Sequence, residues 1–81
     1  MNQIQKALKK LSLKNQLAVL AMMKALRSDY RSVSGVKKMR GFESMFRVRV
    51  GQYRLIFEVL FNGGILFHRL RKRDENTYKN I

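Results

Sequence analysis

Arginines alternate with apolar residues on both sides of a Gly-Gln pair in residues 46–59. Arg47 and Arg49 precede the pair, and Arg54 follows it. A guanidinium group keeps its charge at every relevant pH and presents two parallel donors that match a phosphate, but for the same reason it is a poor general base. The three arginines therefore indicate a surface that binds phosphate and could neutralise charge during phosphodiester cleavage, while another side chain moves the protons.

The candidates for moving protons are few: Tyr78, His68, Glu58 or a lysine. His68 titrates near neutral pH, but a lone histidine on a strand is more often structural, and its expected neighbour Glu58 would only pair with it. Tyr78 follows a basic run, where it could donate a proton or stack on a base. We favour Tyr78, and a tyrosine that merely packs against the sheet edge stays open as the alternative.

Further cations flank these arginines in the sequence. On a normally twisted sheet, Arg73 and either Arg71 or Lys72 are expected to converge with the three strand arginines on one concave side. The alternative is that the arginines only solvate an outer face and prevent pairing at the sheet edge. In addition to the site residues named so far, we expect a second set of residues to contact RNA. They are Arg71, Lys72, Lys37, Lys38 and His68.

The composition is strongly basic and contains no cysteine. Among 81 residues, 18 Lys and Arg stand against 5 Asp and Glu, which gives a net charge of +13. Such a balance favours a polyanionic partner: RNA, DNA or an acidic protein. Without cysteine, and with a single histidine, we expect no metal and no cofactor. A reducing, cytoplasmic setting fits, and neither a signal peptide nor a membrane span is expected.

Apolar periodicity predicts two helices followed by strands. Residues 2–11 carry an apolar stripe at helical spacing, and Ser12 is the expected N-cap of a second helix over residues 13–27. That second helix is apolar over more than half of its surface, so it should lie between two layers or against a partner. With strands expected at residues 36–39, 46–50, 53–61 and 65–70, the chain reads as one domain over residues 1–81. Its predicted α+β fold is an N-terminal helical hairpin packed on a three- to four-stranded antiparallel sheet.

The Gly-Gln pair predicts the register of the main hairpin. In a two-residue loop, Gly51 takes the positive φ of a type II′ turn, Arg49 lies opposite Arg54, and Arg47 lies opposite Ile56. Directly opposed like charges cost about 0.2–1 kcal/mol, so packing alone gives no reason for this pair, whereas an anion between the two arginines would. The remaining expected pairs are Val50 with Tyr53, Val48 with Leu55, and Phe46 with Phe57.

The second turn, Asn62-Gly63-Gly64, leaves two registers open. A three-residue loop would put His68 opposite Glu58 and Lys72 near Arg54, on the cationic side of the sheet. A two-residue loop would reverse the side of the sheet to which the side chains of this strand point.

Taken together, three motifs resemble the RelE/ParE toxin superfamily. They are the run Phe46-Arg-Val-Arg-Val-Gly-Gln-Tyr-Arg-Leu-Ile-Phe57, the Asn-Gly-Gly turn, and the tail Arg73-Asp-Glu-Asn-Thr-Tyr78-Lys79. The resemblance covers residues 39–79, and the helical hairpin before them is similar to that family's N-terminal half. The family usually opens with a strand before its first helix, whereas here the first helix comes almost at once. We therefore expect this sheet edge either to be missing or to be supplied by something else.

The resemblance implies the toxin of a type II toxin-antitoxin pair. The RelE branch cleaves mRNA in the ribosomal A site without a metal, and the ParE branch inhibits DNA gyrase; a non-catalytic RNA-binding module is a third possibility. Strand cations together with a terminal tyrosine favour RelE. The implied partners are mRNA, the ribosome and an acidic cognate antitoxin, which would form a hetero-oligomer with the chain. The implied site residues are Arg47, Arg49, Arg54, Arg73 (or Arg71) and Tyr78, although ribonuclease members often carry lysine where Arg47 and Arg49 stand.

Overall fold

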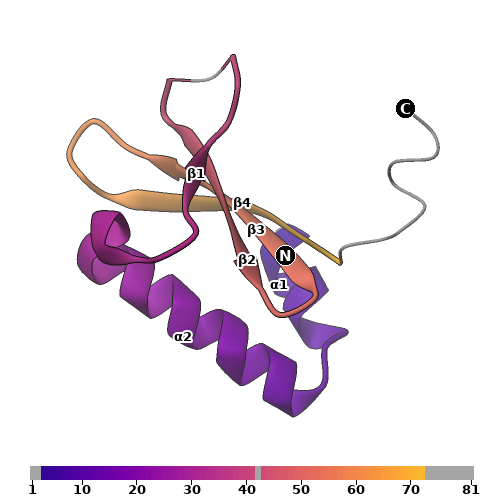
Figure 1. Ribbon diagram of the computed structural model, residues 1–81. Coiled ribbons are helices and arrows are strands. Elements are labelled where there is room, and N and C mark those ends of the chain that lie inside the picture. Colours follow the sequence, from indigo (N-terminus) through magenta and orange to yellow (C-terminus); the bar gives the residue numbers. More distant parts are fainter. Residues whose placement is uncertain (1–2, 42, 73–81) are drawn as a thin grey trace.

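The computed structural model describes residues 3–41 and 43–72 (Figure 1). Its four strands form one antiparallel sheet in the order β1-β2-β3-β4, with both helices preceding them in the chain. This arrangement confirms the predicted α+β fold. The elements are α1 (Gln3–Lys9), α2 (Leu13–Asp29), the 3-10 turn η1 (Tyr30–Ser32), β1 (Lys37–Lys38), β2 (Met45–Val50), β3 (Tyr53–Val59) and β4 (Ile65–Lys72).

The two helices form where the apolar periodicity predicts them. At the start of α2, the hydroxyl of Ser12 accepts a hydrogen bond from the backbone N–H of Asn15 at 3.3 Å, which satisfies one of the free amides of the first turn. The helix extends two residues beyond the predicted end, to Asp29. Within the described residues, neither helix combines the length and the apolar character that crossing a membrane would require.

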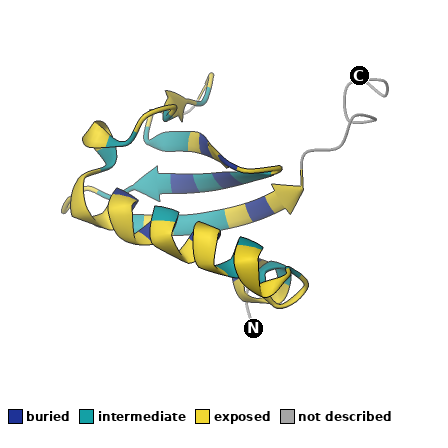
Figure 2. Cartoon of the chain, turned by 60° about the horizontal axis from the view of Figure 1, so that its bottom comes forward, coloured by how far each residue is buried: buried dark blue, intermediate teal, exposed yellow. Residues whose placement is uncertain are grey.

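The core lies between the helices and one face of the sheet. From α2, Val19 and Leu26 are almost completely buried, and they meet a sheet face on which Leu55 and Phe57 are fully buried. These side chains alternate along β3 with Arg54, Ile56 and Glu58 on the other face, two of which are charged, as expected for a sheet covered on one side only. Because α2 packs on the sheet with one side only, its outer surface is exposed along its whole length (Figure 2).

The hairpin of β2 and β3 has the predicted register at every pair, including Arg49 opposite Arg54 and Arg47 opposite Ile56. Gly51 has a φ of 60°, and no described residue other than glycine has a positive φ. Gln52 therefore has a negative φ, which distinguishes the predicted type II′ turn from a type I′ turn, since the latter needs a positive φ at both positions.

The pairing of β3 with β4 changes register along its length: near the turn it matches neither predicted loop, and beyond a bulge it has the reversed parity that the two-residue loop predicted. The loop has three residues, but it begins one residue earlier than expected: Leu60 pairs with Gly64 through a 2.7 Å hydrogen bond, and Gly63 takes a φ of 88°. A β-bulge then shifts the register beside Phe57. As a result, Glu58 lies opposite Leu66 instead of His68, and Lys72 lies opposite Tyr53 instead of near Arg54.

A side-chain amide joins α1 to the outer edge of β4. Gln3 Nε2 donates to the carbonyl of Leu70 at 3.1 Å, and Gln3 Oε1 accepts from the N–H of Leu70 at 3.0 Å. The amide thus makes the two bonds that a neighbouring strand would make at this position. It joins residues 67 positions apart in the sequence and fixes the first helix against the last strand.

We expect Gln3→Ala to lower the free energy of unfolding by about 1–2 kcal/mol, because it removes two hydrogen bonds and leaves the Leu70 backbone groups without their partner. The measurement is urea denaturation followed by circular dichroism. Lys9→Ala, on an exposed position of the same helix, is the control and should change the free energy by less than about 0.5 kcal/mol. Equal stability of the two variants would show that the amide pairing does not hold α1 in place.

Candidate nucleic-acid interface

The sheet face that the helices leave uncovered carries a cluster of cations, held there by strand register. Lys37 of β1 lies opposite Arg47 of β2, and Arg47 lies opposite Ile56, which in turn lies opposite Arg69 of β4. Residues opposite one another in a sheet project to the same side, so these three cations form one row across four strands.

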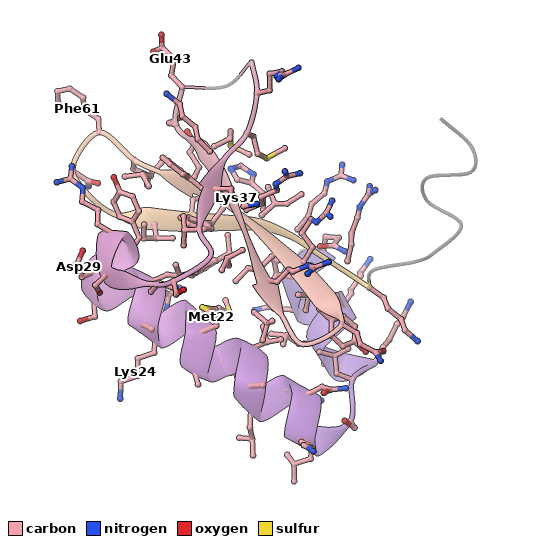
Figure 3. The ribbon with its side chains drawn as sticks, in the orientation of Figure 1. Met22, Lys24, Asp29, Lys37, Glu43 and Phe61 are labelled. Carbon is pink, nitrogen blue, oxygen red and sulfur yellow. The ribbon has the colours of Figure 1, made fainter. Side chains whose placement is uncertain are left out.

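A second row of cations lies beside the first, two residues nearer the Gly51 turn. Arg49, Arg54 and Arg71 are directly opposite one another on β2, β3 and β4. In the following we call the six side chains of both rows the cationic face: Lys37, Arg47, Arg49, Arg54, Arg69 and Arg71. Figure 3 shows nitrogen-tipped side chains gathered beside the sheet, away from α2.

The second row places three like charges directly opposite one another. Opposed residues in an antiparallel pair have Cβ atoms only about 4.5–5.5 Å apart, and like charges at that spacing oppose folding. Arg54 is half-buried, and Arg49 and Arg71 are exposed. Three guanidinium groups on adjacent strands offer several pairs of N–H donors, which suits one or two phosphate groups better than a single carboxylate.

The carboxylate that the described strands place on this face is already engaged. Glu58 Oε1 lies 2.8 Å from His68 Nε2, and the two side chains are 30% and 36% exposed. The predicted contact between His68 and Glu58 is therefore present, although the register that was expected to produce it is not. His68 is the extra residue of the bulge and has no pairing partner on β3, and from this position its side chain reaches Glu58.

The predicted site residues divide into three groups. Arg47, Arg49 and Arg54 lie together on the cationic face, with Arg71 as the late basic residue, and Lys37 joins them. Two other predicted lysines lie on the helix-covered side of the sheet: Lys38 is opposite Phe46, and Lys72 is opposite Tyr53. Arg73 and Tyr78 lie outside the described residues.

Arg69 was missed by sequence reasoning. In regular alternation Arg69 would lie on the opposite side of β4 from His68, but the bulge lets both point to the open face. No glycine or other turn residue marks the bulge in residues 66–69, so the sequence offered no signal for it.

Comparison with known proteins gives one informative similarity. The chain is 36% identical over 45 residues to a curated protein of Methanocaldococcus jannaschii named "Putative toxin RelE1". The match covers 56% of this chain and 50% of the relative, so the chain spans about half the length of the curated relative that it matches. No protein-family model matches the chain, and no solved structure matches it significantly. The resemblance to RelE-like toxins, first seen in the strand and tail motifs, is thus confirmed by a distant relative.

Proposed function

We propose that this chain is the toxin of a type II toxin-antitoxin pair and acts in the cytoplasm as a ribosome-dependent, metal-independent mRNA endoribonuclease. The row of Arg49, Arg54 and Arg71 is the observation that carries the proposal, because it concentrates phosphate-binding groups on the sheet face opposite the helices. The similarity to a RelE-type toxin supports the same conclusion.

In the proposed reaction, the 2′-oxygen of a nucleotide attacks the phosphorus of its own 3′-phosphodiester. The new bond joins the 2′-oxygen to phosphorus, the bond from phosphorus to the 5′-oxygen of the next nucleotide breaks, and a 2′,3′-cyclic phosphate remains. The 2′-hydroxyl loses its proton to a base, and the leaving oxygen gains one from an acid. The arginine row stabilises the extra negative charge that the phosphorane carries between these steps.

Proton transfer is assigned in this proposal to Tyr78, with Arg73 as a further phosphate ligand; both lie outside the described residues. His68 suits the role less well, because its Nε2 is hydrogen-bonded to Glu58. A requirement for the 2′-hydroxyl would restrict the substrate to RNA.

A second part of the proposal concerns the antitoxin. Leu13, Leu17 and Leu20 on α2 are 71%, 59% and 49% exposed. Their spacing of four and three residues forms one apolar seam along the solvent side of the helix, the spacing at which a second helix packs. We call these three leucines the leucine seam. Lys14 and Lys24 flank it, and Figure 3 shows Lys24 pointing away from the sheet. An amphipathic antitoxin helix with acidic flanks complements both the seam and its charges.

Arg54→Ala should reduce ribosome-dependent mRNA cleavage about 100-fold, the usual effect of removing one donor to a transition-state oxyanion. The measurement is primer extension on an mRNA incubated with the purified protein, with and without translating ribosomes. Lys24→Ala also removes one positive charge, but from the outer surface of α2, and should cleave at the normal rate.

If the unmodified protein produced no cuts in either reaction but abolished supercoiling by DNA gyrase, the ParE-like alternative would replace this proposal. Steeply salt-dependent RNA binding without any product would instead indicate a non-catalytic RNA-binding module.

Leu17→Gln should weaken antitoxin binding about 10- to 100-fold, because it puts a polar group in the middle of the leucine seam. The antitoxin is identified as the protein whose co-expression relieves growth arrest, and its affinity is measured by isothermal titration calorimetry. Phe61→Gln is the control, because it makes a similar apolar-to-polar change outside the leucine seam. Phe61 is fully exposed and lies in the loop between β3 and β4. Equal affinity of both variants would exclude the seam from the interface.

A further inference from the structure

A pocket of about 540 Å³ lies between α1 and the end of β4, outside the cationic face. Its size is within the range of small-ligand sites. Figure 1 shows α1 beside the sheet on the side away from the viewer, and the contacts of α1 are concentrated on β4. Gln3 and Leu70, which are joined by two hydrogen bonds, form part of its wall.

Three lysines line this pocket, and no acidic residue of the described chain does. Lys6 belongs to α1, Lys10 directly follows the helix, and Lys72 belongs to β4. No salt bridge joins any of them to a described carboxylate. Three ammonium groups around one cavity raise its affinity for anions, since low-dielectric walls focus their field.

The rest of the lining is aromatic and apolar. Tyr53 is half-buried beside the pocket, and Leu11 and Leu70 complete the apolar part of its wall. A ligand that fits must therefore join a negative group to a flat or apolar one. A nucleotide has both, because its phosphate can reach the lysines while its base stacks on the tyrosine ring.

The pocket and the cationic face meet at the same end of the sheet. The opposed pair Tyr53 and Lys72 lines the pocket, and the next pair of the ladder, Arg54 and Arg71, belongs to the cationic face. Successive side chains point to opposite faces of a sheet. A single RNA strand that leaves the arginine row and continues past the Tyr53–Lys72 end of the ladder would therefore reach the pocket after a few nucleotides.

We infer that this pocket is a second RNA subsite, which binds a phosphate and base of the strand flanking the nucleotides on the cationic face. The inference rests on the proposed function in taking RNA as the ligand, but it concerns binding and is independent of cleavage. A three-nucleotide RNA is long enough for the cationic face alone, whereas a twelve-nucleotide RNA reaches both sites.

The test is fluorescence anisotropy with 5′-fluorescein-labelled oligouridylates of three and twelve nucleotides. In the double variant Lys6→Gln/Lys10→Gln, affinity for the twelve-nucleotide RNA should fall about tenfold, and affinity for the trinucleotide should change less than twofold. The slope of log affinity against log salt should decrease by about 0.7 for the longer RNA, the change expected for one lost phosphate contact on a single strand. Lys72→Gln, from the opposite wall, should likewise weaken only the longer RNA.

The matched control is Lys9→Gln/Lys14→Gln, which removes the same charge from exposed positions outside the pocket. Equal losses in the control and pocket variants would overturn the inference, as would equal losses for both RNA lengths. So would a pocket variant that binds RNA normally but no longer binds an octaglutamate peptide, because the site would then belong to an acidic protein segment. None of these results alters the ribosome-dependent cleavage test, so the subsite and the proposed function can fail separately.

Discussion

The two-residue turn at Gly51-Gln52 is the constraint on which the other features depend. By fixing the pairing of β2 with β3, it decides which side chains of both strands enter the core and which remain outside. A shift of one residue would carry Val48 and Leu55 to solvent and bury arginines in their place. The free-energy cost of burying those charges makes any other register inaccessible. The same register therefore buries the apolar side chains and leaves the arginines exposed.

This division also explains how so small a chain tolerates its charge. The core from Val19 and Leu26 to Leu55 and Phe57 is compact and wholly apolar, and no buried polar or charged side chain occurs among the described residues. The repulsion between the described cations is therefore at the surface, where solvent and salt screen it. A polyanion that binds the folded chain offsets the repulsion that remains, so binding and folding are thermodynamically linked.

Local signals in the sequence were sufficient for the helices, the α2 cap and the main hairpin, because each depends on residues close together in the chain. The β3-β4 pairing was not predictable, since Asn62-Gly63-Gly64 is compatible with several loops and the bulge beside Phe57 has no sequence marker. The same bulge explains why Arg69 was missed and why Lys72 was expected on the wrong face. The contact of Gln3 with Leu70 and the pocket beside it join distant parts of the chain, for which a single sequence carries no signal.

The amide of Gln3 has a consequence for how copies of this chain meet one another. An open sheet edge is a template for intermolecular strand pairing and hence for aggregation. At one edge, β1 has only two residues, both exposed lysines. At the other, Gln3 already occupies the Leu70 backbone groups that a neighbouring strand would need. At one border the short, charged strand β1 discourages pairing with another chain, and at the other Gln3 interrupts the edge of β4 at Leu70, so that a second strand could not pair with β4 along its whole length.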